Sequence, residues 1–493
     1  MKILLVYPKY INTFWSFKDA LKFISKKATH PPLGLLTVAA MLPKEWEKKV
    51  VDMNVDPLRD KDLQWADYVF ISAMSIQQES VKEVISKCKE MGVKTVAGGP
   101  LFTTGYEDFE DVDHFVLNEA EITLPTFLTD LKNGCAQRMY TSEEFPDIQK
   151  TPIPLWELIN MKKYATMSIQ YSRGCPFNCE FCNITALFGH KVRTKSTAQV
   201  IRELESIYSQ GWRGDVFFVD DNFIGRKRTL KKETLPAIIE WMGRNNYPYF
   251  FNTEASIDLS DDEELMQLMV RAGFNSVFVG IETTNEESLA ECNKVQNENR
   301  DLLASVKKIQ KFGLQVQGGF IVGFDNDPPS IFEKLSEFIQ ESGIVTAMVG
   351  LLNAPRNTRL YQRLVKEGRL LNDVSGDNTD FSINFTPAMD YETLMEGYKR
   401  IIRRIYSPEP YFKRVRKFLR NYKPLGEKKF HFRFTYIRAF LKSVLFLGIL
   451  GRERIYYWKL FFWSLFRRPQ IFHLAITFAI YGFHFRKVFK ECL

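Results

Sequence analysis

The sequence predicts an α/β protein in three parts. These are an N-terminal doubly wound, Rossmann-like domain over residues 1–135, a partial (β/α)6 barrel over residues 166–390 and a helical, basic C-terminal domain over residues 391–493. Strand-like and helix-like segments alternate on both sides of a proline-rich linker at 136–165, and the alternation then stops. Since 493 residues exceed what one hydrophobic core organises, several domains are expected.

The composition is that of a globular chain, with 45% hydrophobic and 26% charged residues and no long low-complexity tract, which excludes a largely disordered protein. The first residues, "MKILLVYPKY", have too short an apolar run for a signal peptide and no cleavage site. We therefore expect a cytoplasmic protein whose cysteines are thiols or metal ligands. The sequence has no uninterrupted run of about 20 apolar residues, so a membrane-spanning helix is not predicted.

The N-terminal domain is predicted from short apolar runs separated by helix-like segments. The strands are expected at 2–8, 48–54, 67–74, 94–100 and 112–121, and the helices at 31–42 and 79–92. Strand–helix alternation with short turns indicates a parallel sheet, whose ligands bind beyond the carboxyl ends of the strands. The loops at this edge are 72–80, 98–105 and 118–123.

The barrel is predicted from six further strand–helix units. Its strands are expected at 165–172, 215–223, 249–256, 276–283, 315–325 and 345–353. Six units are fewer than the eight of a closed barrel, and functional groups are expected at the carboxyl ends of the strands.

Three of the seven cysteines lie in the segment "SRGCPFNCEFCNI" at 172–184. Cys175, Cys179 and Cys182 have C-x3-C-x2-C spacing, and thiolates are the usual ligands of iron–sulfur clusters. Three ligands would leave one iron of a four-iron cluster open, as a catalytic zinc keeps an open position. Three buried free thiols or a zinc site are the alternatives, although zinc would need a fourth ligand and His190 lies outside the usual spacing.

With this loop at a strand end, the chain resembles the radical S-adenosylmethionine (SAM) superfamily. Similar motifs follow in order at the next strand ends: "VDDNF" (219–223), "TEAS" (253–256), "GIET" (280–283) and "GGFIVGFD" (318–325). The resemblance implies a [4Fe–4S] cluster on the three cysteines and SAM on the open iron, where its cleavage gives a radical that abstracts hydrogen. The SAM contacts that it implies are Phe181, Asp220, Glu254, Ser256, Glu282 and Gly319.

The N-terminal domain resembles that of the cobalamin-binding subclass. Its loops "VAGGPLFTT" and "NEAEIT" are similar to that family's "GGP" and "GEGE" loops, but Asn118 and Ala120 stand where glycines are common. The implied cobalamin contacts are Ser72, Met74, Ser75, Gly98, Gly99, Pro100, Thr103, Asn118 and Glu119. No histidine lies in a D-x-H-x-x-G motif, so we expect the lower face of the cobalt to lack histidine. A Rossmann-like domain without a cofactor is the alternative.

Within this subclass the chain most resembles the hopanoid C-2 methyltransferase group and its relatives, through "ISAMSIQQES", "PIPLW", "SRGCPFNCEFCNIT" and "AMVGLLNAP". The resemblance implies a cobalamin-dependent C-methyltransferase that acts on an unactivated carbon of a lipid-like substrate, a hopanoid or another polyisoprenoid. A radical rearrangement or cyclisation without methyl transfer is the alternative reaction.

The basic character of the chain belongs to its tail, where residues 411–493 hold 19 Lys and Arg residues against three Glu. The apolar segments 443–450 and 471–483 are too short or interrupted to span a bilayer. Residues that favour a lipid interface lie between them: Arg452, Arg454, Tyr457, Trp458, Lys459, Trp463, Arg467 and Arg468. We predict that the tail lies on the inner face of the membrane, and a helical cap on the barrel is the alternative, which is compatible with it.

The other expected partner is a reducing electron donor of the flavodoxin or ferredoxin type. A basic, aromatic tail also occurs in nucleic-acid-binding proteins. Here the aromatic residues sit in apolar runs such as "KLFFWSLF", so no nucleic-acid partner is expected. A cluster-bearing membrane adaptor that does not cleave SAM is the non-catalytic alternative.

Overall fold

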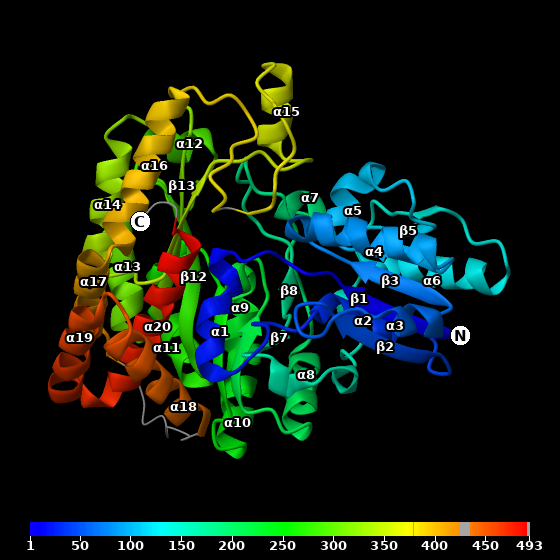
Figure 1. The fold of residues 1–493 in the computed structure, drawn as a ribbon, viewed down its shortest axis with the longest axis horizontal. Helices are drawn as coiled ribbons and strands as arrows, with labels where there is room; N and C mark the ends of the chain where they lie inside the picture. The colour runs from blue at the N-terminus through cyan, green and yellow to red at the C-terminus, as the bar shows by residue number, and fades with distance from the viewer. Residues whose placement is uncertain (378, 424–433, 491–493) are drawn as a thin grey trace.

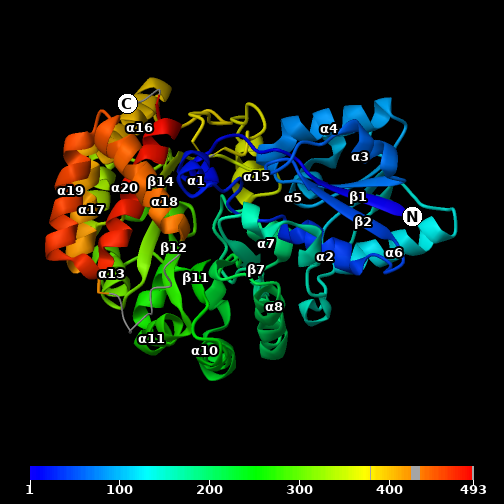
Figure 2. The ribbon, with the colours of Figure 1, turned by 60° about the horizontal axis from the view of Figure 1, so that its bottom comes forward.

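The computed structural model describes residues 1–377, 379–423 and 434–490. It confirms the predicted α/β class. Figures 1 and 2 show an N-terminal sheet domain at one end of the molecule, the second sheet in the middle and the C-terminal helices at the other end.

The N-terminal domain is a parallel six-stranded sheet in the order β2-β1-β3-β4-β5-β6. Its strands are β1 (Lys2–Tyr7), β2 (Glu47–Asp52), β3 (Tyr68–Ser72), β4 (Lys94–Gly98), β5 (His114–Val116) and β6 (Met139–Tyr140). Its helices are α2 (Leu33–Met41), α3 (Asp60–Trp65), α4 (Gln78–Glu90), α5 (Pro100–Gly105) and α6 (Ala120–Lys132). The helix after β1, α1 (Lys18–Ile24), instead packs against α18 (Phe434–Ser443) and α20 (Phe472–Val488) of the C-terminal domain (Figure 2). Ile3 to Val6 of β1 are fully buried, because helices cover both faces of a doubly wound sheet.

The second sheet is also parallel and has six strands, in the order β7-β10-β11-β12-β13-β14. The strands are β7 (Met167–Ile169), β10 (Gly214–Phe218), β11 (Tyr249–Glu254), β12 (Phe274–Glu282), β13 (Gln315–Val322) and β14 (Ala347–Leu351). The intervening helices are α8 (Thr197–Ser209), α9 (Lys227–Thr229), α10 (Leu235–Arg244), α11 (Glu263–Ala272), α12 (Glu286–Glu291), α13 (Leu302–Lys311) and α14 (Ile331–Ser342). The sheet does not close on itself among the described residues, which is the predicted partial barrel.

The cysteine loop leaves β7 and is bracketed by a short antiparallel pair, β8 (Ser172–Arg173) and β9 (Arg193–Thr194), with α7 (Ile184–Phe188) inside it. After β14, α15 (Arg359–Lys366) and the residues around it return across the top of the barrel toward the N-terminal domain (Figure 1).

The C-terminal domain is helical, as predicted. It comprises α16 (Tyr391–Tyr406), α17 (Pro408–Asn421), α18 (Phe434–Ser443), the π-helical segment η10 (Val444–Ile449), α19 (Arg454–Arg467) and α20 (Phe472–Val488). Tyr398 and Tyr406 of α16 donate to the carbonyls of Val349 and Ala347, so α16 is fixed on the edge strand β14.

The helices of the C-terminal domain differ in burial. Eight of the 17 residues of α20 are buried and two are exposed, and its Phe485 stacks on Phe14 with ring centroids 4.3 Å apart. The segment 471–483, expected at a membrane surface, is therefore part of a packed core, as is Tyr457, whose hydroxyl pairs with Ser443. The cap alternative holds for α16, α17 and α20, whereas α18 to α19 expose apolar side chains.

Candidate active site

The cysteine loop is shaped by Gly174 and by its own backbone. Gly174 has φ +88, and a Cβ there would lie 2.9 to 3.0 Å from the carbonyl oxygens of Phe188, Gly189 and Lys191. Only glycine fits such a position without strain. The loop thus folds back on itself and presents three partly buried thiols from one short segment.

Burial sets the chemistry of these thiols. It raises the pKa of Cys182 to about 12 and also raises the pKa of Cys175. A metal centre that binds thiols overcomes this penalty, because a coordinated thiol is deprotonated. The three thiols are suited to hold an iron–sulfur cluster.

Asp220 fixes the start of the loop. Its carboxylate accepts hydrogen bonds from the backbone N–H of Tyr171 at 3.1 Å and from both the N–H and the hydroxyl of Ser172. Both oxygens are therefore occupied by the strand that leads into the cysteines.

Three acids gather beside the loop, of which Asp220 is buried and Asp221 and Glu254 are partly buried. Burial raises the pKa of Asp220 to about 7, of Asp221 to about 6 and of Glu254 to about 8, and the other two carboxylates add to the shift of Glu254. Asp221 Oδ2 is buried without a hydrogen-bond partner. A cationic ligand would relieve this repulsion, and SAM, with its sulfonium and ammonium groups, has the required charge.

The sheet register places Glu254 and Gly319 on one face. Glu254 of β11 pairs with Phe278 of β12, and Phe278 pairs with Gln317 of β13, two residues before Gly319. Side chains alternate along strands, so these positions share the interior face. A Cβ on Gly319 would lie 2.7 Å from the Phe278 ring, so the glycine leaves this ring its place.

Three phenylalanines occupy the same interior face: Phe217, Phe250 and Phe278. Phe217 of β10 pairs with Asn252 of β11, and Asn252 lies two residues from both Phe250 and Glu254, so all of these side chains point to the same face. All three are only partly buried, whereas Val216, Phe218 and Phe251 on the opposite face are fully buried. Trp15 and His30, from the segment after β1, contact Phe278 and Phe217 with ring centroids 5.4 and 5.2 Å apart.

Of the remaining predicted SAM contacts, Ser256 lies close to the acids: its hydroxyl accepts a hydrogen bond of 3.1 Å from Asn222, the residue after Asp221. Phe181 packs away from them, against Phe324 in the apolar cluster under α15.

Glu282 ends β12 in a left-handed conformation, with φ +63, and forms a 2.7 Å ion pair with Lys294. Sequence reasoning missed Lys294. Burial opposes its charge, but Glu282 and the nearby Cys179 thiol raise its pKa, so it stays protonated. Gln296, also missed, donates to Cys179 Sγ at 3.8 Å. These side chains place one positive charge and one amide donor beside the cysteines.

The predicted cobalamin contacts meet at the carboxyl edge of the N-terminal sheet. A Cβ on Gly98 would lie 2.6 Å from the Val116 carbonyl, and one on Gly99 (φ +89) would lie 2.6 Å from Ser72 Oγ. Pro100 begins α5, and Thr103 Oγ1 accepts from the Asn118 N–H at 3.0 Å. Asn118 has φ +59, a conformation that asparagine tolerates better than most residues where glycine is usual.

Two predicted contacts lie on the loop after β3. Met74 is 45% exposed, and Ser75 lies under the segment after α15, where a Cβ on Gly376 would meet its backbone carbon at 2.9 Å. Gly98 and Gly99 thus let the end of β4 lie close to β3 and β5, and Met74 is exposed at the same edge.

Glu119 joins the two domains. Its carboxylate forms ion pairs with Arg173 at 2.6 Å and Arg193 at 2.7 Å, the residues that bracket the cysteine loop. Glu121 pairs with Arg173 at 2.9 Å, and all four side chains are at least 86% buried. The segment "NEAEIT" singles out Glu119 as a site residue, but nothing in the sequence indicates that Arg173 and Arg193 bind it.

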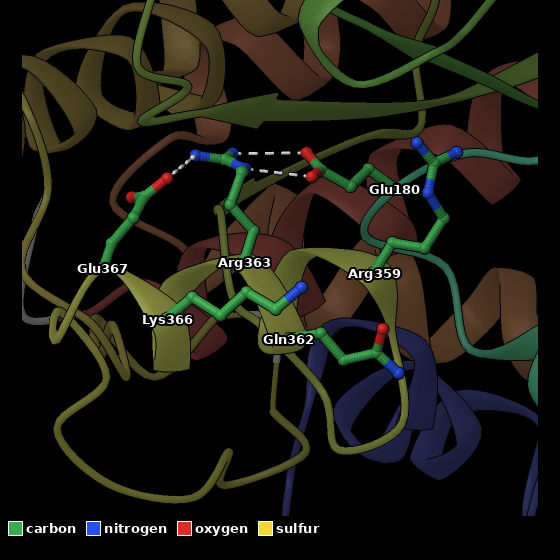
Figure 3. A pocket seen from close by; sticks show the side chains of 6 residues that line it. All are labelled: Glu180, Arg359, Gln362, Arg363, Lys366 and Glu367. Atoms are coloured by element: carbon green, nitrogen blue, oxygen red, sulfur yellow. Dashed lines mark hydrogen bonds and ion pairs between the residues drawn. The ribbon is translucent and has the colours of Figure 1, made fainter.

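A surface hollow of about 380 Å³ lies beside the cysteine loop, against α15 (Figure 3). Charged side chains line it, and Arg363 binds both carboxylate oxygens of Glu180, the residue after Cys179. The hollow is polar and lies outside the barrel face that carries the acids.

Family models match three consecutive regions: a B12 binding domain at 23–128, the radical SAM superfamily at 169–339 and a domain of unknown function, DUF4070, at 358–493. An uncharacterized methyltransferase of Synechocystis is 40% identical over 98% of this chain and 91% of its own length. A hopanoid C-2 methylase of Rhodopseudomonas palustris is 35% identical over 84% of this chain and 78% of its own length. The chain belongs to the cobalamin-binding radical SAM methyltransferases.

Solved structures agree with this family at the level of the fold. A cobalamin-dependent SAM radical enzyme, OxsB, with aqua-cobalamin bound, covers all of this chain with a TM-score of 0.64 and 15% identity, over 80% of its own length. The SAM methyltransferase TsrM of Kitasatospora setae covers 76% of this chain and 79% of its own, with a TM-score of 0.59 and 16% identity.

As a cobalamin-binding radical SAM methyltransferase, the protein uses cobalamin, SAM and a [4Fe–4S] cluster, and it requires a reductant and a substrate. The residues described above fit these groups: three thiols on one loop, an acidic group with an orphaned oxygen, and a strand-end edge with an exposed Met74.

Proposed function

We propose that the enzyme methylates an unactivated carbon of a lipid-like substrate, a hopanoid or another polyisoprenoid. The observation that carries the proposal is the 35% identity to a hopanoid C-2 methylase over 84% of the chain. The interior face of the barrel supports it, because Phe217, Phe250, Phe278 and Trp15 offer an apolar, aromatic surface to a substrate with few polar groups.

Each group of side chains has a role in this proposal. Cys175, Cys179 and Cys182 hold the cluster, and Asp221 and Glu254 face the positive charge of SAM. Bound together, the cofactors supply a radical that abstracts hydrogen and a methyl group that replaces it. The residues of this chain position them and exclude water from the site.

Ser256, Glu282 and Gly319 are the further SAM contacts of this proposal. Of the other two predicted contacts, Asp220 acts by holding the strand that leads into the cysteines, and Phe181 packs against Phe324. The edge from Ser72 to Glu119 is assigned to cobalamin. A flavodoxin- or ferredoxin-type protein supplies electrons, and the enzyme works at the cytoplasmic face of the membrane without a nucleic-acid partner.

The proposal is tested by anaerobic turnover with the full chain. Protein reconstituted with cluster and cobalamin is given SAM carrying a deuterated methyl group, a reductant and either a hopanoid or a bacteriochlorophyllide. We expect mass spectrometry to show one labelled methyl group on the hopanoid only. A hopanoid product of unchanged mass would indicate rearrangement or cyclisation, and labelling of the other substrate alone would contradict a lipid-like substrate.

Single cysteine variants provide the control. Cys182→Ala is expected to lose the iron and all product, because a cluster ligand is removed. Cys135→Ala, which removes an exposed thiol outside the loop, is expected to keep both. Equal iron content in the two variants would contradict the assignment of the cluster to the loop.

A further inference from the structure

Exposed apolar side chains concentrate on one part of the C-terminal domain. Of the 21 large hydrophobic residues that are exposed among the described residues, eleven fall between Tyr436 and Phe466. Leu450 is 65%, Ile455 62% and Phe466 76% exposed. Single exposed apolar residues are ordinary, but a concentration of this kind marks an interaction surface. We call the exposed side chains of residues 436–466 the docking face.

The docking face is built from two stripes. Ile437, Leu441, Leu445 and Ile449 follow each other at intervals of four along α18 and η10, which places them on one side of the helix. In α19, Phe462 and Phe466 are also four residues apart. Trp458 Nε1 donates to the Gly448 carbonyl at 2.9 Å, so the two helices are joined and the stripes meet at the turn between them.

Basic residues rim this surface. Arg438, Arg452, Arg454, Lys459 and Arg467 are exposed. The single acid between 436 and 468, Glu453, is neutralised by Arg486 in a 2.6 Å ion pair. An apolar surface with a positive rim is complementary to a layer that is apolar inside and negatively charged outside.

We propose that the docking face binds the surface of an anionic lipid bilayer. Amphipathic helices insert their apolar face at the level of the headgroups, basic residues near the surface add electrostatic attraction, and tryptophan favours the interface. Within the described residues no helix is long and apolar enough to cross a membrane. The contact is therefore with one leaflet.

The docking face is joined to the barrel interior through the segment after β1. Phe446 of η10 contacts Phe23 of α1 with ring centroids 6.0 Å apart. A few residues earlier in the chain, Trp15 contacts Phe278, beside Gly319 on the interior face. One short segment thus contacts both the lipid-facing helices and the aromatic face of the site.

Vesicle co-sedimentation of the full-length holoenzyme tests the proposal. Wild-type protein is expected to bind vesicles of phosphatidylcholine mixed with phosphatidylglycerol, and to bind pure phosphatidylcholine much more weakly. Raising the salt from about 0.1 M to about 1 M shortens the Debye length from about 10 to about 3 Å and should weaken the binding. The double variant L450E/F466E is expected to lose at least about tenfold in partition coefficient, since it removes two of the most exposed apolar side chains.

Matched variants keep the test decisive. L371E introduces one glutamate, half the charge change of L450E/F466E, at an apolar residue that is 60% exposed outside the docking face, and it should bind like the wild type. R452E/R454E should lose at least about 20-fold, because each basic residue contributes about fivefold. K61E/K132E, with the same charge change at exposed positions of the N-terminal domain, should lose far less.

Unchanged binding by L450E/F466E, or equal losses in the docking-face and control variants, would overturn the proposal. So would a wild-type protein that binds no vesicles but self-associates, with L450E/F466E monomeric, since the face would then join two copies. Sedimentation needs no turnover, so a failure of the proposed substrate would leave this result unaffected.

Discussion

Lys294 is a buried positive charge whose partner is also buried. Its side chain is 12% exposed, and that of Glu282 is 8% exposed. Replacing Lys294 by Met leaves the Glu282 carboxylate buried without compensation, and we expect a loss of about 3 to 5 kcal/mol in the free energy of unfolding. Denaturant unfolding of the anaerobic protein measures it.

The double variant Lys294→Met/Glu282→Gln serves as the control. It removes both charges, so it should be more stable than Lys294→Met alone. A double variant that is less stable than the single one would show that the ion pair is not the source of the effect.

At the residue scale, the sequence predicts those site residues that lie close together in the chain or that occupy a special backbone conformation. The cysteine triplet is visible within eight residues, and Asn118 in place of a glycine agrees with its left-handed backbone. Lys294 is separated by twelve residues from Glu282 and belongs to no motif. Only the fold brings it to the cysteines.

Among the elements, the cysteine loop depends most on a single backbone position. Gly174→Ala adds a methyl group against three carbonyl oxygens at 2.9 to 3.0 Å and strains a left-handed backbone. We expect bound iron to fall below half of the wild-type value. Gly211→Ala is the matched control, because Gly211 has φ +84 but no atom within 4 Å of the added carbon.

The control separates backbone strain from the steric contact. Gly211→Ala should cost about 1 to 2 kcal/mol of stability while keeping the iron. Iron and sulfide analysis after reconstitution checks both variants. Equal iron in both would mean that the close approach at Gly174 does not shape the cluster loop.

The sequence predicts the longer strands of both sheets, whose apolar runs are buried by helices. The structure also has β6, β8 and β9, which the sequence did not predict. Each is two residues long, too short to show any periodicity. β8 and β9 nevertheless bracket the cysteines, so pairing over a long loop, which no local pattern reports, defines the ends of the site.

Across the whole molecule, domain order and class follow from the sequence, but contacts between domains do not. The basic, aromatic tail was expected to act as one unit, yet α20 is buried while α18 to α19 expose their apolar residues. These helices are all rich in apolar and aromatic residues, so their composition does not reveal which of them packs against the rest of the protein. The same holds for Glu119, a predicted cobalamin contact whose carboxylate lies between two arginines of the barrel domain.

The ion pairs of Glu119 are expected to couple the two cofactor domains. Glu119→Gln keeps the shape of the side chain but leaves the buried Arg173 and Arg193 with less negative charge, which should lower the free energy of unfolding by about 3 kcal/mol or more. Asp56→Asn is the control: its pair with Lys163 joins the N-terminal domain to the linker and is much more exposed, so it should contribute less than about 1 kcal/mol. Denaturant unfolding of both variants, with cluster and cobalamin bound, gives the comparison. A loss in Glu119→Gln no larger than that in Asp56→Asn would show that the buried network does not hold the sheet edge against the cysteine loop.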